Sequence, residues 1–311
     1  MNIVKPINLL ITEMLSERDC NNDTLNTYQR KLNLWITWMV QNGDISNPTL
    51  ERVIAYKKYL TKSGHRETTI YGYLAVIKIL SKWMDKKGIC SDFTAGIKWS
   101  KEESSSVRGV LNINQVVSIL MSMPTVTERN LRDYAIVNLM LNTGARCIEV
   151  TRIDRSDIDD LHGMYRMRLR RKGRLSKSTP IPITKEVFSP IASYMTHAML
   201  TPNTNPLFLS VGSLPGRRLT TKTISRICIE AMKQVGITGK EFTAHSFRHT
   251  AAMIAFLNGV PLSGIQQMLG HKSQSTTEGY LRRLSETNNE AAKAIAAIGC
   301  AITKASNNNN N

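Results

Sequence analysis

The chain has 311 residues, enough for two domains with cores of their own, and 41 Lys and Arg against 24 Asp and Glu give it a formal net charge of +17. A charge of this size attracts polyanions, so the composition favours a nucleic acid partner, although a basic protein without such a ligand would have the same composition. Five scattered cysteines argue against a disulfide framework or a zinc cluster, and the chain has neither an apolar run of about 20 residues that could span a membrane nor the plan of a signal peptide. We therefore expect a cytoplasmic, nucleoid-associated protein with no membrane contact.

Residues 1–99 are predicted to form an all-α domain. Apolar and aromatic side chains recur with helical spacing in three stretches, each with a capping residue before it and a glycine after it. The predicted helices run from a cap at Asn22 or Asp23 to Gly43, from a cap at Asn47 with Pro48 in the first position to Gly64, and from a cap at Thr68 or Thr69 to Gly88. The aromatic residues of these stripes are assigned to the core, whereas the lysines between them either follow a phosphate backbone or form a solvated face.

A polar segment rich in serine divides the chain. Residues 100–107 read SKEESSSV, which is the composition of a linker. We therefore predict a domain boundary there, with a second domain over residues 108–288 and a tail over residues 289–311 that ends in an asparagine run. The asparagine run is of low complexity and is expected to be disordered.

The second domain is predicted to mix helices with a small β-sheet. Residues 163–183 indicate a hairpin, because apolar and arginine side chains alternate along its first arm and the turn falls at Lys172 and Gly173. Prolines in the second arm, Pro180 and Pro182, suit an edge strand. Helices are expected over residues 128–144, 220–236, 243–260 and 263–271, so the whole chain is of the mostly α class with an α+β second domain.

The helix that begins near Thr243 carries an unusual set of side chains in its first turn. His245 and Arg248 are three residues apart and share a face, at a helix end that binds anions through its free N–H groups. The alternative is that His245 has a backbone partner and Arg248 pairs with a carboxylate. A zinc site is not predicted, because the glutamate of an H-E-x-x-H motif and a third ligand are missing.

Other candidate residues lie just after predicted helix ends. Arg146 follows the Thr-Gly stop of one helix, and Glu149 is one turn further on, where it can hold the arginine side chain. His271 lies just beyond an apolar helix, in LGHKS, and Tyr280 comes nine residues later, in STTEGYLRR. Each of these residues alone has an ordinary structural explanation.

Taken in order, the motifs GARCIEV, HSFRH, LGHKS and TTEGY resemble those of the tyrosine recombinase (phage integrase) family, of the simple two-domain Xer-like or transposon-integrase type. The N-terminal helices are similar to the core-binding domain of that family, so the resemblance extends over about residues 6–287. The family also has a lysine in a β-hairpin, usually in a GKG turn. Lys172 matches it, with Arg171 in place of the first glycine, and Lys177 is the alternative.

The resemblance implies a site-specific recombinase that cleaves and rejoins DNA through a covalent 3′-phosphotyrosine, without metal or cofactor. Tyr280 would be the nucleophile, and Arg146 and Arg248 would bind the non-bridging phosphate oxygens. The implied catalytic set is Arg146, Lys172, His245, Arg248, His271 and Tyr280. Within it His245 would take or relay the tyrosine proton, His271 would donate to the phosphate, and Lys172 would protonate the departing 5′ oxygen.

The implied partner is double-stranded DNA, bound by a homo-tetramer that brings two duplexes together and passes through a Holliday junction. Accessory DNA-bending proteins are a further expectation. The tail would contribute a short helix that docks on a neighbouring protomer, or else on its own domain. Two other functions remain open from the residues alone, a type IB-like topoisomerase and a catalytically inactive DNA-binding regulator. No extra arm-binding domain is expected before the first helix.

Overall fold

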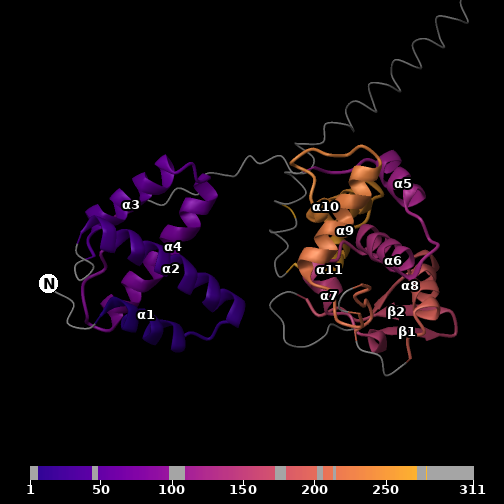
Figure 1. The fold of residues 1–311 in the computed structure, drawn as a ribbon, viewed down its shortest axis with the longest axis horizontal. Helices are drawn as coiled ribbons and strands as arrows, with labels where there is room; N and C mark the ends of the chain where they lie inside the picture. The colour runs from indigo at the N-terminus through magenta and orange to yellow at the C-terminus, as the bar shows by residue number, and fades with distance from the viewer. Residues whose placement is uncertain are drawn as a thin grey trace, which may run out of the picture. The chain divides into compact units, whose positions relative to one another are not determined.

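The structure is a computed structural model that describes residues 6–43, 48–97, 109–171, 180–201, 206–212, 215–271 and 278. The chain divides into two compact units, residues 1–105 and 106–311 (Figure 1). The predicted linker over residues 100–107 and the predicted tail over residues 289–311 lie outside the described residues. Among the helices that are described, none combines the length and the apolar character needed to cross a membrane.

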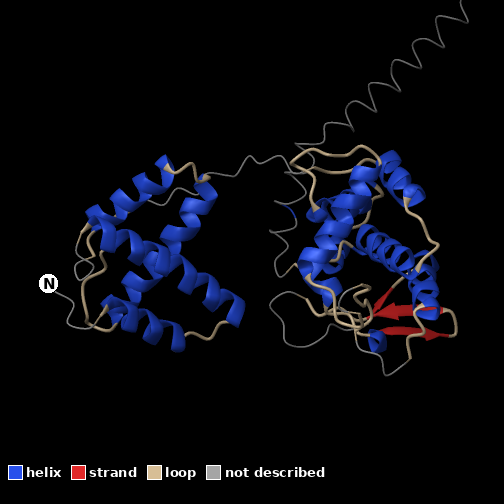
Figure 2. Cartoon of the chain, in the orientation of Figure 1, coloured by secondary structure: helices blue, strands red, loops and turns tan. Residues whose placement is uncertain are grey.

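The first unit contains only helices in the part that is described (Figure 2). They are α1 (Ile7–Ser16), α2 (Asn22–Asn42), α3 (Leu50–Lys62) and α4 (Glu67–Lys86). The apolar stripe of each helix faces the others, and the fully buried Trp35 of α2 stacks on Phe93 with ring centroids 6.0 Å apart. The prediction of an all-α unit is confirmed for these helices. Of its aromatic residues, Trp35 and Tyr56 are in the core as predicted, whereas Tyr59 and Tyr71 are exposed.

The predicted helix starts of this unit are less accurate than the predicted ends. Helix α3 begins at Leu50 because the Thr49 hydroxyl accepts the N–H of Arg52 at 3.4 Å, so the expected start at Pro48 is wrong. Helix α4 begins at Glu67 with no side-chain cap, which places Thr68 within the helix instead of before it. Propensity for a cap is a weak signal when packing of the apolar face decides where the helix begins.

The second unit is mostly helical with one small sheet. Its helices are α5 (Ile113–Ser122), α6 (Glu128–Thr143), α7 (Cys147–Thr151), α8 (Lys185–His197), α9 (Thr221–Gln234), α10 (Ala244–Leu257) and α11 (Leu262–Leu269), with a 3-10 turn η1 (Arg155–Asp157). The strands are β1 (Ile158–Leu161), β2 (Met164–Met167) and β3 (Ile181–Pro182). The fold class predicted from the sequence is confirmed.

The sheet has the antiparallel order β1-β2-β3. Pairing of Met167 with Ile181 confirms the predicted hairpin, and Pro182 lies on an edge strand as expected. The predicted turn falls outside the described residues. Strand β1 was not expected, because its sequence IDDL has two aspartates. It is held by pairing with β2 and by an ion pair of 3.0 Å between Asp159 and Arg168.

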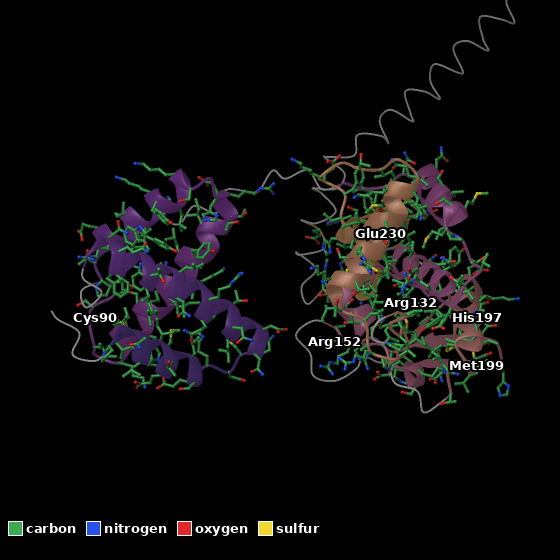
Figure 3. All side chains as sticks on the ribbon, viewed as in Figure 1. Cys90, Arg132, Arg152, His197, Met199 and Glu230 are labelled. Atoms are coloured by element: carbon green, nitrogen blue, oxygen red, sulfur yellow. The ribbon has the colours of Figure 1, made fainter. Side chains whose placement is uncertain are left out.

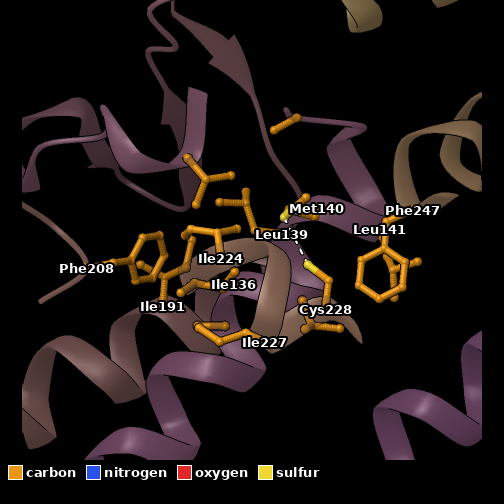
Figure 4. Packing of buried hydrophobic residues seen from close by; sticks show 14 of the residues in the cluster. Ile136, Leu139, Met140, Leu141, Ile191, Phe208, Ile224, Ile227, Cys228 and Phe247 are labelled. Carbon is orange, nitrogen blue, oxygen red and sulfur yellow. Dashed lines mark hydrogen bonds between the residues drawn. The ribbon is translucent and has the colours of Figure 1, made fainter. Parts of the chain in front are cut away.

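Helix α6 runs through the middle of the second unit and is buried on nearly all sides. Residues 135–141 are all buried, so the helix has no solvent-exposed face over these two turns. Figure 4 shows side chains of α6 and α9 in contact at the core, where the Cys228 thiol lies 3.7 Å from the Met140 sulfur. Because α6 and α10 pack together, the end of α6 at Gly144 lies beside the first turns of α10.

Buried arginine side chains join separate elements of this unit. Arg132 of α6, labelled in Figure 3, is 4% exposed. Its guanidinium donates to the Asp133 carboxylate at 2.7 Å and to the carbonyl of Leu209 at 2.8 Å. This pair has no role in the site described next, which makes it a useful reference for the arginines that do.

Candidate active site

The first turn of α10 is fixed by a capping box. The Thr243 hydroxyl accepts the N–H of His245 at 3.2 Å, and the Ser246 hydroxyl accepts the N–H of Thr243 at 3.0 Å. In this turn His245 is exposed, whereas Arg248 is only 1% exposed. The two cationic or titratable side chains of the motif therefore have different surroundings, one accessible to a ligand and one built into the fold.

Arg248 joins the ends of two helices. Its Nη1 donates to the carbonyl of Gly144 at 2.7 Å and its Nη2 to the carbonyl of Leu269 at 2.6 Å. The same Nη2 lies 3.0 Å from Nε2 of His271. A guanidinium has no acceptor, so Nε2 must accept and the neutral imidazole carries its proton on Nδ1. Arg248 thus fixes the end of α6 relative to the end of α11, although Gly144 is 104 positions away from it in the sequence.

Arg146 lies against the same helix ends and is held by Glu149. The arginine Nη1 donates to Glu149 Oε1 at 2.8 Å, and the backbone N–H of Arg146 donates to Oε2 at 3.0 Å. Burial raises the pKa of the Glu149 carboxyl, but the backbone N–H of Arg146 and the positive charges of Arg171 and Arg146 outweigh it and lower that pKa. The predicted contact between the two residues is therefore present, with the carboxylate ionised and fully buried.

One carbonyl oxygen receives both guanidinium groups. Leu269 O accepts from Arg248 at 2.6 Å and from Arg146 at 3.4 Å, so the two side chains converge on the last residue of α11. Gly144 permits this approach because its φ of +63° is left-handed and a Cβ there would lie 3.1 Å from the Leu269 side chain. Two forked donors side by side are suited to an oxyanion with several equivalent oxygens, such as a phosphodiester.

Comparison with known proteins shows the family of the chain. The phage integrase family model matches residues 110–287, and the model of the phage integrase N-terminal SAM-like domain matches residues 7–88. The chain belongs to the phage integrase family. It is a tyrosine recombinase, a DNA strand-transferring enzyme, as the sequence motifs predicted.

Individual relatives of this recombinase agree with the family match over most of the chain. Tyrosine recombinase XerD of Listeria innocua serovar 6a is 26% identical over 86% of this chain and 90% of its own length. The structure of XerH site-specific recombinase bound to palindromic difH substrate has a TM-score of 0.71 at 19% identity, over 91% of this chain and 83% of that chain. A lambda integrase tetramer bound to a Holliday junction has a TM-score of 0.68 at 17% identity, over 90% and 77%. These structural similarities show a shared fold.

Four of the six predicted site residues of the recombinase are described, and three of them are in one cluster. Arg146, Arg248 and His271 meet around the end of α11, while the exposed ring of His245 lies 4.7 Å from that of His249 in an edge-to-face arrangement. Lys172 and Tyr280 lie outside the described residues, so their places in the site remain predictions.

One residue of the cluster was noticed in the sequence only as a departure from the GKG pattern. Arg171 is 6% exposed, and its Nη1 lies 3.4 Å from Glu149 Oε2. The signal that could have identified it is the extra arginine where the family pattern has glycine, since a side chain of that length at the base of a hairpin must find a partner for its charge.

The imidazole of His271 is kept neutral by its surroundings. Burial, together with the positive charges of Arg248 and Arg146, lowers the pKa of His271 from 6.5 to about 4. Between those values the unfolded chain binds a proton at this residue and the folded chain does not. The free energy of unfolding is therefore expected to decrease as the pH falls from about 6.5 to about 4.

Replacing His271 with Gln removes this titration and is expected to flatten the pH dependence of stability in that window. Urea unfolding measured at several pH values would report the slope, and His197→Gln, an exposed histidine on α8, is the matched control that should keep it. An unchanged slope in His271→Gln would contradict the assignment of a neutral imidazole.

Proposed function

We propose that the cluster of Arg146, Arg248 and His271 binds the scissile phosphate in a site-specific recombination reaction for which Tyr280 supplies the nucleophile. The observation that carries the proposal is the convergence of two guanidinium groups on one carbonyl oxygen, with a neutral histidine 3.0 Å from one of them. Arg146 is partly exposed and Arg248 lies beside it, so a phosphodiester at this position would meet two positive charges at once.

In the proposed reaction the Tyr280 oxygen attacks phosphorus and the bond to the 5′ oxygen breaks. The products are a 3′-phosphotyrosine and a free 5′-hydroxyl, and the reverse attack by a 5′-hydroxyl of the partner strand reseals the DNA. A phenol has a pKa near 10, so His245 is proposed to accept its proton, and Lys172 to protonate the leaving oxygen. The covalent link conserves the energy of the phosphodiester, so the residues need no cofactor to rejoin the strands.

Arg146 and Arg248 are proposed to neutralise the charge that builds up on the non-bridging oxygens. Each directs one nitrogen toward Leu269 O, so an oxyanion beside that carbonyl would find donors of both side chains close together. Nε2 of His271 accepts from Arg248 in the described arrangement. A phosphate that draws the guanidinium away would release Nε2, and a shift of the ring proton from Nδ1 to Nε2 would then let His271 donate to the same phosphate, the role that its motif predicts.

Basic and amide side chains on the surface of both units are proposed to contact the duplex. The exposed face of α9 carries Lys222, Arg226 and Lys233, and that of α2 carries Asn26, Gln29, Arg30 and Asn33. Lysine and arginine suit phosphates, while amides and arginine can also bind base edges in the major groove.

The double variant Lys222→Ala and Arg226→Ala is expected to weaken DNA binding at all sequences. If each side chain neutralises one phosphate, the slope of log affinity against log salt should decrease by about 2. Binding isotherms from 50 to 200 mM salt, by fluorescence anisotropy, measure this slope. Lys185→Ala, which removes an exposed lysine on α8, is the control. If the double variant has the same slope as the unaltered chain, the exposed face of α9 does not contact DNA.

The assembly and the domain limits follow as proposals from the family. The core-binding domain is assigned to residues 1–99, the linker to 100–107, the catalytic domain to 108–288 and the exchanged tail to 289–311. A lambda integrase of similar fold is a tetramer on a Holliday junction, which supports a homo-tetramer on two duplexes here. Accessory DNA-bending proteins and action on cytoplasmic, nucleoid DNA belong to the same proposal.

Trapping on a nicked suicide substrate tests the proposed function directly. The nick lets the cleaved fragment diffuse away, so the covalent complex accumulates and survives denaturing electrophoresis. Peptide mapping should find the DNA on Tyr280, and end analysis should find a free 5′-hydroxyl on the released strand. A different attachment residue or a 5′-phosphoryl linkage would overturn the assignment.

A further inference from the structure

Arg171 is the third arginine of the cluster and is among its most buried side chains, at 6% exposed. It lies two residues after the fully buried Leu169, at the base of the predicted hairpin. Its Nη2 donates to the carbonyl of Met268 at 2.9 Å and to that of Gln267 at 3.3 Å, while Nη1 lies 3.4 Å from Glu149 Oε2. The one side chain therefore connects the segment after β2, the carboxylate below Arg146 and the last turn of α11.

Arg171 and Arg146 divide one carboxylate between them. Glu149 presents Oε1 to Arg146 at 2.8 Å and Oε2 to Arg171 at 3.4 Å. Without the second guanidinium, Oε2 would keep the backbone N–H of Arg146 but lose its second donor, and the carboxylate would be held less tightly. Because the position of the Arg146 guanidinium depends on that of the carboxylate, Arg171 limits where Arg146 can point.

Arg171 also caps the helix whose end carries His271. The last carbonyls of a helix have no partners within it and form the negative end of its dipole, so cations are favourable there. Arg171 takes the carbonyls of Gln267 and Met268, and Arg248 takes that of Leu269. Gly270, with φ +63°, then turns the chain to His271, and a Cβ on it would lie 2.8 Å from Nε of Arg171.

We propose that Arg171 is a positioning residue that sets the orientation of Arg146 through Glu149 and fixes the turn to His271 through the end of α11. It touches no reacting atom. The proposal rests on the proposed function, in which Arg146 neutralises the phosphate. The alternative is a cross-link that serves stability alone, as the pair of Arg132 and Asp133 does.

Substrates that differ in charge separate these two roles. Single-turnover formation of the covalent adduct is measured on the nicked substrate with an ordinary scissile phosphate and with a methylphosphonate, which has no negative charge for Arg146 to neutralise. Arg171→Met is expected to slow the reaction about 10- to 100-fold on the phosphate, the size of effect found for groups that orient the side chains binding a metal ion. On the methylphosphonate the loss should shrink to about threefold or less.

An equal loss on both substrates, or no loss on either, would overturn the proposal. Arg168→Met, which removes an arginine that pairs with Asp159 on the neighbouring strand, is the matched control and should leave both rates unchanged. If Arg171→Met does not fold, Arg171→Lys serves instead, since it keeps a positive charge near Glu149 but lacks the fork that contacts the carboxylate and the carbonyls through separate nitrogens. It should show a smaller loss with the same dependence on substrate charge.

A failure of the underlying function would look different. Arg146→Ala should lose far more activity on the phosphate than on the methylphosphonate. If Arg146→Ala reacts normally on the phosphate, the proposed function of Arg146 is wrong, whatever Arg171 does. If Arg146→Ala behaves as expected and Arg171→Met does not, the proposed function stands and the inference about Arg171 fails.

Discussion

Tyr280→Phe is expected to bind DNA normally and to form no covalent adduct. Phenylalanine keeps the ring but has no oxygen to attack phosphorus, and loss of a covalent nucleophile in other enzymes costs about 10⁴-fold or more in rate. The measurement is the fraction of labelled nicked substrate that becomes resistant to SDS, alongside a binding isotherm for the same preparation.

Tyr165→Phe is the matched control for the loss of a phenol. Tyr165 stacks on Phe188 with ring centroids 4.2 Å apart, and phenylalanine at that position preserves the stack. The control should form the adduct at the normal rate. An adduct that persists in Tyr280→Phe would remove this tyrosine from the reaction and leave the recombinase with another nucleophile.

Arg248→Lys is expected to lower both the rate of cleavage and the stability of the fold. Loss of one preorganised donor to a transition-state oxyanion costs about 10²–10³-fold in rate. Arg248 reaches the carbonyls of Gly144 and Leu269 through separate nitrogens, which the single Nζ of lysine does not reproduce, so a buried carbonyl is expected to lose its partner at a cost of about 1–3 kcal/mol. Single-turnover cleavage and urea unfolding measure the two effects.

Arg132→Lys separates the two effects of that substitution. Arg132 is also buried and donates to a carbonyl, that of Leu209, but it is outside the site. This control should lose stability to a similar extent while its folded fraction cleaves DNA at the normal rate. Equal losses of cleavage in the two variants would mean that Arg248 acts only through the fold.

Local patterns in the sequence predicted the elements that carry the site. The stop at Gly144 and the helix start near Thr243 depend on a few neighbouring residues, and both helix ends lie where the sequence places them. Glu149 was assigned to Arg146 from spacing alone, since residues three apart share a helix face. The fold class followed in the same way from helical periodicity and one alternating strand.

What the sequence could not predict depends on contacts between distant segments. Strand β1 forms despite two aspartates because β2 and Arg168 are beside it. The burial of Arg248 and Arg171 was also not evident, since both bind carbonyl groups that every residue possesses. Because every residue has a carbonyl, the sequence does not indicate which carbonyls accept from the arginines. These acceptors can be identified only when the path of the backbone is known.

The same reliance on main-chain oxygens makes the arginine cluster tolerant of evolutionary drift. Arg248 is held by the carbonyls of Gly144 and Leu269, and no side-chain replacement at either residue deletes those oxygens. The residues that cannot change freely are instead Gly144 and Gly270, because both have a left-handed backbone conformation. Most of the surrounding side chains could therefore change without removing the acceptors that hold Arg248.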